Sequence, residues 1–131
     1  METLNIVDQY IDCCIINGSH YDISLATVEI LKNKYKYTGN NIWYYLSENQ
    51  EWVLDDKQVN LKNDIKTKVC NAFIQRSLYW DNKASEITND INLSIDFKFR
   101  SNKLLTICSK LKDDKYILTI IKESKSFFND K

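Results

Sequence analysis

The sequence predicts an α+β fold: a mostly helical single domain, residues 1–131, with one small β-hairpin packed on the helices. The chain has 131 residues, which is the usual size of one domain with its own core. It has no proline and two glycines, a composition that excludes collagen-like chains and Gly-rich phosphate loops and disfavours tight-turned β-sandwiches. Hydrophobic residues make up 44% and aromatic residues 12%, so a folded globule is expected instead of a disordered chain.

Residues 3–35 are predicted to form a helical hairpin. Apolar residues recur every three or four positions over 3–17, with Thr3 as a plausible N-cap and Gly18 as the residue after the C-cap. A second helix is predicted over about 22–35, with Ser19 or Asp22 as its N-cap. The two apolar faces consist of Leu4, Val7, Tyr10, Ile11, Cys14 and Ile15 in the first helix, and Ile23, Ala26, Thr27, Ile30 and Leu31 in the second.

A β-hairpin is predicted at about 41–54, because two runs of strand-forming residues flank a polar turn. Alternation along the first run places Trp43 and Tyr45 on the same face. Trp43 and Trp52 are expected to face each other across the hairpin and to be buried as structural aromatics against the helices, since two isolated strands are marginal in water. The alternative is that these rings stack on a nucleobase.

The remaining residues, 58–128, are predicted to form C-terminal helices. A long helix is expected over about 58–79, preceded by Asp55 and Asp56 near its start. Its apolar face is Leu61, Ile65, Val69 and Phe73, flanked by Cys70 and Ile74.

Residues 80–100 are ambiguous, because a four-residue period of isoleucines runs into a stretch that alternates like a strand. The favoured interpretation is a helix over about 84–94 followed by extended chain over 95–100. Ser101 is then expected to cap a helix that reaches Leu111, and Asp113 or Asp114 to cap the last helix.

The net charge is zero, with 18 basic and 18 acidic residues, but the two signs are unevenly distributed. Residues 1–56 carry nine acids and three lysines, whereas residues 57–131 carry nine acids and fifteen bases. Such asymmetry suggests either two faces with different partners or an internal electrostatic match between the halves. Both interpretations remain open from the sequence.

The four cysteines, at positions 13, 14, 70 and 108, lack C-x-x-C spacing, and His20 is the one histidine. Zinc binding is therefore not expected, and the cysteines are interpreted as reduced core residues. The N-terminal residues do not resemble a signal peptide, and no apolar run approaches the ~20 residues of a membrane span. The expected setting is the cytosol or the nucleus, and secretion and membrane insertion are not expected.

No enzymatic activity, metal or cofactor is predicted. The sequence contains no P-loop, no G-x-S-x-G elbow and no H-E-x-x-H motif. Cys13 or Cys14 beside His20 could in principle form a nucleophile and base, but a His at a helix end beside core cysteines is more often inert. The acidic pairs at 55–56 and 113–114 could hold a metal ion, but both precede helices, where carboxylates cap free N–H groups.

A basic stretch from 98 to 125 could follow a phosphate backbone. The candidate DNA-contacting residues are Arg100, Lys103, Lys110 and Lys112. Acids interrupt the stretch and lysine far outnumbers arginine, so any DNA binding is expected to be weak, independent of sequence and governed by salt. The alternative is a solvated face of mixed charge.

Three stretches of the chain, covering about residues 20–128, resemble a known family. They are His20-Tyr21-Asp22-Ile23-Ser24-Leu25-Ala26; Trp43-Tyr44-Tyr45 with Trp52, Asp55 and Leu61; and the stretch from Lys103-Leu104-Leu105 through Ile120-Ile121-Lys122-Glu123 to Phe127-Phe128. The chain resembles the domain that precedes the superfamily III helicase module in primase–helicases of nucleocytoplasmic large DNA viruses, which is related to a domain of satellite-phage primases. The W-Y-x(7)-W segment is the most specific part.

The resemblance implies a non-enzymatic interdomain or assembly module of a viral replicative primase–helicase. Its partners would be the helicase and primase modules of the same polypeptide, with weak contact to DNA, and an oligomeric full-length protein is compatible with it. The family's catalytic motifs lie outside this domain, so no catalytic residue is carried over. The alternative is a stand-alone viral protein-interaction domain that binds a host or viral partner through its acidic helical hairpin.

Overall fold

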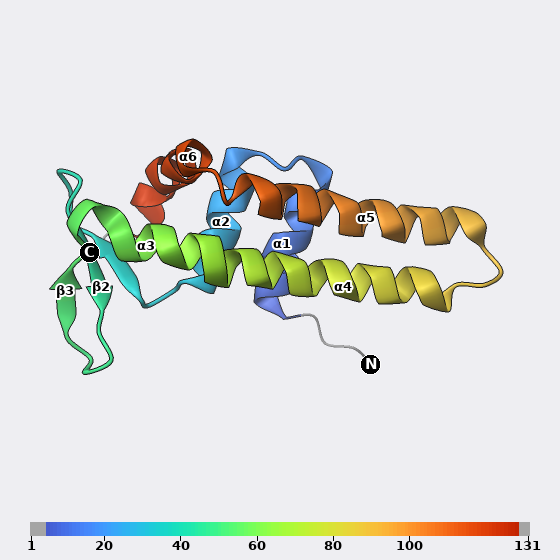
Figure 1. Ribbon diagram of the computed structural model, residues 1–131, viewed down its shortest axis with the longest axis horizontal. Helices are drawn as coiled ribbons and strands as arrows, with labels where there is room; N and C mark the ends of the chain where they lie inside the picture. Colours follow the sequence, from blue (N-terminus) through green and yellow to red (C-terminus); the bar gives the residue numbers. More distant parts are fainter. Residues whose placement is uncertain (1–4, 129–131) are drawn as a thin grey trace.

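The computed structural model describes residues 5–128 and confirms a mostly helical α+β fold with a small antiparallel sheet at one end (Figure 1). Two long helices, α4 and α5, lie antiparallel, and α1 and α2 pack across them (Figure 1). Within the described part of the chain, no helix combines the length and the apolar character needed to cross a membrane. The elements are α1 (Ile6–Ile16), α2 (His20–Ile30), β1 (Tyr35–Tyr37), β2 (Trp43–Leu46), β3 (Trp52–Leu54), α3 (Val59–Asp64), α4 (Cys70–Glu86), α5 (Ile91–Lys110) and α6 (Asp114–Ser124).

The predicted helical hairpin forms, with shorter helices than expected. The Asn5 side chain caps α1 by accepting a hydrogen bond from the Val7 amide at 2.7 Å; the predicted cap, Thr3, lies outside the described residues. Gly18 follows the C-cap with φ +60°, the left-handed conformation expected of it. Ser19 caps α2, as predicted. Helix α2 ends at Ile30 because the chain turns and enters β1.

The predicted β-hairpin is present as β2 and β3, but the sheet has a third strand. Strand β1 pairs antiparallel with β2, giving the order β1-β2-β3. The inner face of this sheet is aromatic and buried: Tyr35 is 5% exposed and Trp43 is 1% exposed. The Trp43 ring meets the ring of Phe128 edge-on, with the centroids 5.5 Å apart, so the sheet packs on the end of the chain that follows α6.

The prediction that Trp43 and Trp52 face each other, both buried, is correct for the burial of Trp43 and wrong for Trp52. In the observed register Trp43 pairs with Tyr37, and Trp52 pairs with Leu46. Leu46 lies three residues after Trp43, so the two side chains point to opposite faces of the sheet, and Trp52 follows Leu46. Trp52 is 41% exposed on the outer face, where the Lys36 ammonium lies 4.7 Å from its ring centroid.

The long helix predicted from residue 58 is present and extends further than predicted. Helix α3 continues through a π-helical segment, Ile65–Val69, directly into α4. The π-helical bond runs from the Cys70 amide to the Ile65 carbonyl. Asp55, which is 1% exposed, accepts hydrogen bonds from the Asn60 and Leu61 amides, both at 2.9 Å. This carboxylate therefore caps the start of the helix, as expected for an acid at this position.

The expected helix over 84–94, the extended chain over 95–100 and the helix start at Ser101 are wrong. Helix α4 continues to Glu86, and α5 starts at Ile91 with Asp90 as its cap, accepting from the Leu93 amide at 3.1 Å. The strand-like alternation is misleading because this part of α5 is largely solvent-exposed: Phe99 is 59% exposed. A hydrophobic pattern predicts the type of element only where its apolar residues are buried, so exposed apolar residues here gave a false strand signal.

The last helix is predicted correctly. Asp113 caps α6 by accepting a hydrogen bond from the Tyr116 amide at 3.0 Å. The buried face of α6 contains Ile117, Ile120 and Ile121, and it packs on α2. The main core therefore lies where α1, α2 and α6 meet the α4–α5 pair, while the far end of that pair projects beyond α1 (Figure 1).

Candidate groove between α1 and α5

The four candidate DNA-contacting residues do not form one cluster. Arg100, Lys103 and Lys110 lie on one side of α5, and Lys112 lies in the turn that follows the helix. Ten residues separate Arg100 from Lys110, which is about 15 Å along the helix axis. Arg100 and Lys103 line a groove beside α1, whereas the Lys110 ammonium lies 6.0 Å from the ring centroid of Tyr116.

Arg100 is already engaged within the protein. Its guanidinium donates to Asp96 Oδ2 from both Nε and Nη2, each at 3.1 Å. The same guanidinium lies 4.7 Å from the ring centroid of Trp80 and 5.7 Å from that of Phe97. A DNA phosphate would have to compete with these interactions, so Arg100 is a poorer candidate contact than the sequence indicates.

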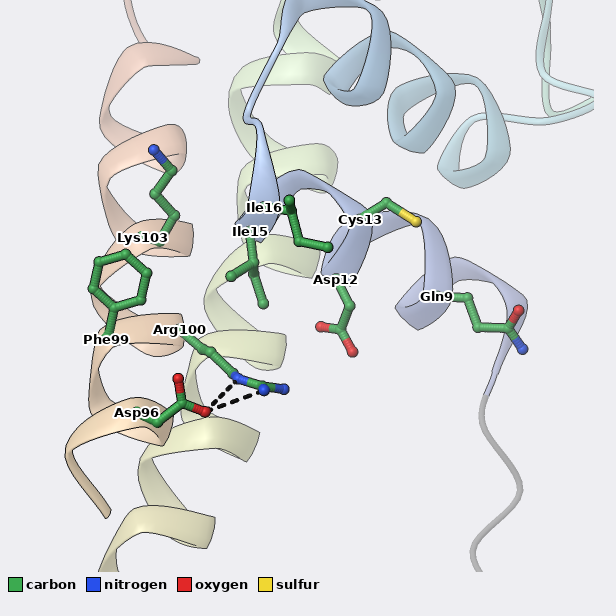
Figure 2. A pocket seen from close by; sticks show the side chains of 9 residues that line it. All are labelled: Gln9, Asp12, Cys13, Ile15, Ile16, Asp96, Phe99, Arg100 and Lys103. Carbon is green, nitrogen blue, oxygen red and sulfur yellow. Dashed lines mark hydrogen bonds and ion pairs between the residues drawn. The ribbon is translucent and has the colours of Figure 1, made fainter. Parts of the chain in front are cut away.

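The groove between α1 and α5 has a volume of about 640 Å³, within the size range of binding sites for small ligands and short side-chain anchors. Figure 2 shows its lining side chains, with Phe99 and Lys103 on α5 and Ile16 and Cys13 on α1. The complete lining is Gln9, Asp12, Cys13, Ile15, Ile16, Asp96, Phe99, Arg100 and Lys103. The groove is not predicted from the sequence. Among its lining residues, Arg100 and Lys103 are the expected DNA contacts, and Cys13 is one of the two thiols considered beside His20.

Apolar side chains in and beside this groove are unusually exposed. Ile16 is 83% exposed and Phe99 is 59% exposed, and Ile6, one turn before the groove on α1, is 55% exposed. On α1 the exposed positions Ile6, Cys13 and Ile16 are spaced by seven and three residues and therefore lie on one stripe. Apolar side chains that gather in a groove in this way are typical of an interaction surface.

One residue of the groove lining, Asp12, belongs to a polar network that fixes α1 to α4. Asp12 on α1 accepts two hydrogen bonds from the Arg76 guanidinium, at 3.0 and 2.6 Å, and a third from Trp80 Nε1 at 3.0 Å. Arg76 is 6% exposed, and its guanidinium stacks 3.9 Å from the ring centroid of Tyr79. Hydrogen bonding to Asp12 and the nearby carboxylates raise the pKa of Arg76 despite the opposing effect of burial, so it stays charged.

This network also bears on the uneven charge distribution. Arg76 in the basic half pairs with Asp12, and lies 3.7 Å from a carboxylate oxygen of Asp8, in the acidic half. At this point the halves are matched internally. One sequence signal could have predicted this ion pair. Arg76, one of two arginines in the chain, follows Phe73 by three residues and therefore lies beside an apolar helix face.

Both carboxylates that line the groove are engaged in hydrogen bonds, while the Cys13 thiol in its lining is exposed. The carboxylate of Asp12 is occupied by Arg76 and Trp80, and Asp96 is occupied by Arg100. Among residues 5–128, no group of three or more His, Cys, Asp and Glu side chains could hold a metal ion. Lys103 is the lining charge that makes no ion pair with a described residue, so the groove presents apolar surface with one available cation at its rim.

Among the described residues, His20 makes no hydrogen bond with Cys13 or Cys14, and Cys13 is exposed in the groove lining. Cys14, Cys70 and Cys108 are buried, and burial raises the pKa of Cys14 and of Cys70 to about 12. The His20 ring instead meets Tyr116 edge-on, with 5.3 Å between centroids.

No protein-family model matches the chain, and no curated protein sequence matches it.

Proposed function

We propose that this chain is a non-enzymatic interdomain or assembly module of a viral replicative primase–helicase, which positions the helicase motor. The α1–α5 groove is the feature that supports this proposal most directly, because it offers exposed apolar surface on two neighbouring helices. The sequence resemblance supplies the context. A module of this kind would act in the host cytoplasm or nucleus, wherever the viral genome is replicated.

The occupant of the groove is a helix of the neighbouring helicase module. Helices dock in grooves through apolar side chains at positions i, i+3 or i+4, and i+7, and α1 and α5 supply apolar walls in Ile16 and Phe99. Lys103 at the rim selects a carboxylate on the docking helix, since an opposite charge steers and orients a partner. DNA contact is secondary in this proposal, because Arg100 is held by Asp96.

The test is a binding titration of this chain with the superfamily III helicase module encoded by the same genome. Ile16→Glu and Phe99→Glu each place a charge among the groove's apolar side chains, and binding should weaken by about tenfold or more. Both side chains are exposed, so both variants should fold. The matched control is Leu105→Glu, which introduces the same charge at a 40% exposed position of α5 that does not line the groove.

No binding by the parent chain would overturn the primase–helicase assignment. If the groove variants and the Leu105 control bound equally well, the groove would not be the docking site. A stand-alone interaction domain would use the same groove for a host or viral protein, and it would fail to bind the helicase module.

A further inference from the structure

A second cavity lies on a different part of the molecule, between the start of α3, α6 and the β1–β2 loop. It has a volume of about 520 Å³. Four lysines line it, Lys57, Lys62, Lys122 and Lys125, together with the amide side chains of Asn41 and Gln58. We call these six residues the lysine pocket. Trp43, Leu118 and Ile121 supply the apolar part of the lining.

Within residues 5–128, no carboxylate compensates the charge of the lysine pocket. No Asp or Glu of this part of the chain lines the cavity or forms an ion pair with one of its lysines. The Asp114 carboxylate interacts electrostatically with Lys62, but its ion-pair partner is Lys66, whose ammonium is 2.7 Å away. Neither Asp114 nor Lys66 lines the cavity. Four like charges around one hollow repel each other and focus a positive potential in it, which a bound anion would relieve.

Two of the polar groups are held in place before any ligand arrives. The Lys125 ammonium donates to the side-chain oxygen of Asn41 and lies 5.4 Å from the ring centroid of Tyr37. Gln58 Nε2 donates to the Asn41 carbonyl at 3.4 Å. An ammonium has three hydrogens and a side-chain amide has two, so both groups keep donors for a ligand.

Three residues that line the pocket have left-handed backbone conformations. Asn41, Lys57 and Gln58 have φ values of +61°, +56° and +55°. For lysine and glutamine in particular, the left-handed region is unfavourable, and such outliers are concentrated at ligand sites. These three lining residues come from two separate loops; Asn33, Asn40 and Gln50, which do not line the cavity, also have positive φ values.

We infer that the lysine pocket binds an oligophosphate anion, a chain of two or three linked phosphates as in pyrophosphate or a nucleoside triphosphate. Lysine binds phosphate as a point charge and does not require the planar geometry of arginine. One phosphate group carries at most about two negative charges, so four lysines match a chain of linked phosphates better than a single group. The inference concerns binding without hydrolysis and does not depend on the proposed docking groove.

The experiment is a calorimetric titration of the whole chain with sodium pyrophosphate at low salt. We expect saturable binding of one pyrophosphate per chain, with weaker binding of inorganic phosphate. In the double variant Lys62→Gln/Lys122→Gln, the affinity should fall by about tenfold or more, because hydrogen bonds to charged groups are lost. The matched control, Lys32→Gln/Lys34→Gln, removes the same charge at exposed positions outside the pocket and should change the affinity by less than about twofold.

Two further measurements identify the site and the source of the phosphates. In amide NMR spectra, pyrophosphate should shift the signals of Asn41, Lys57 and Gln58. ATP should bind through the same lysines, whereas a short single-stranded DNA should bind more weakly per phosphate. Equal losses in both double variants, titration that does not saturate, or tighter binding of the DNA through the same lysines would each overturn the inference.

Discussion

The Asp12 carboxylate satisfies three donors at once, and its main partner is a nearly buried charge. Arg76 is 6% exposed, and it would keep its charge if Asp12 were removed. Asp12→Ala should therefore lower the free energy of unfolding by about 3 kcal/mol, the lower end of the range for breaking a buried ion pair, because Asp12 itself is partly exposed. Urea unfolding of the two proteins measures the difference.

Asp96→Ala is the control for Asp12→Ala. It also removes a carboxylate that pairs with an arginine, but the side chains of Arg100 and Asp96 are 38% and 48% exposed. Exposed pairs contribute at most about 1 kcal/mol. A loss as large as that of Asp12→Ala would show that burial does not decide the cost.

The two hairpin tryptophans should respond differently to truncation. Trp43 is 1% exposed and contacts Tyr37 and Phe128, so Trp43→Ala should destabilise the protein by about 3–5 kcal/mol. Trp52 is 41% exposed on the outer sheet face, so Trp52→Ala should cost about 1 kcal/mol or less. Chemical denaturation tests both variants, and similar costs would contradict the assignment of the two faces.

The four cysteines should differ in reactivity. Cys13 is exposed, whereas the other three are buried, and the raised pKa values of Cys14 and Cys70, about 12, keep those thiols protonated at neutral pH. Iodoacetamide should therefore label one cysteine in the native protein and four in denaturant. Mass spectrometry counts the labels, and a Cys13→Ser variant should remain unlabelled while folded. Rapid labelling of that variant would contradict the burial of the other three.

At the scale of single elements, signals carried by neighbouring residues were sufficient for most of the fold. Ser19 and Asp113 cap the helices they were expected to cap, because a cap depends on residues two or three positions away. Strand β1 is not predicted because its three residues, Tyr35 to Tyr37, are too few to show an alternating pattern. Their pairing with β2 depends on the tertiary fold and not on neighbouring residues. Asp90 was missed as a cap because the isoleucine period appeared to continue through it.

Neither cavity could be predicted from the sequence. The α1–α5 groove joins residues more than eighty positions apart, such as Cys13 and Phe99, and the lysine pocket joins Lys57 to Lys125. Composition could indicate excess lysine in the second half but not which lysines converge. The sequence predicts Arg100 in extended chain and Lys103 on a helix that starts at Ser101, whereas both residues lie on α5. The pairing of Arg100 with Asp96 depends on that helix starting at Ile91.

The cap of α5 offers a test at this scale. Asp90 accepts a hydrogen bond from the Leu93 amide, which has no partner inside the helix. Asp90→Ala should therefore cost about 1 kcal/mol of stability. The control is Asn92→Ala at the exposed second residue of α5, which removes no cap. Its free energy of unfolding in urea should stay within about 0.5 kcal/mol of that of the parent. Equal stabilities of the two variants would contradict the observed helix start.

For the whole molecule, the α4–α5 pair has two ends of unequal stability. Near the sheet and α2, it is covered on several sides, and Phe73 and Leu104 are both fully buried. The far end projects beyond α1 (Figure 1), and there Ile91 is 75% exposed and Ile95 is 60% exposed. Each helix at that end is supported mainly by the other, so this arm should open without unfolding the core.

Hydrogen exchange tests this expectation. Backbone amides in 82–96 should exchange faster than those in 70–77 and 103–111, although all three ranges consist largely or wholly of helix. Mass spectrometry of peptides from the exchanged protein resolves the ranges. Uniform protection along both helices would mean that the arm unfolds only with the core.

The π-helical turn at Ile65–Val69 has a consequence for how this protein can change over evolutionary time. Such a turn accommodates one additional residue locally while the flanking turns keep their phase, so Leu61 before it and Phe73 after it can both face the core. Loss of one exposed residue here, Thr67 for example, would leave a regular helix with that phase intact. The same loss within α4 would rotate every later side chain by about 100°. Homologues that differ by a single-residue deletion in the long helix are therefore expected to carry it at this turn.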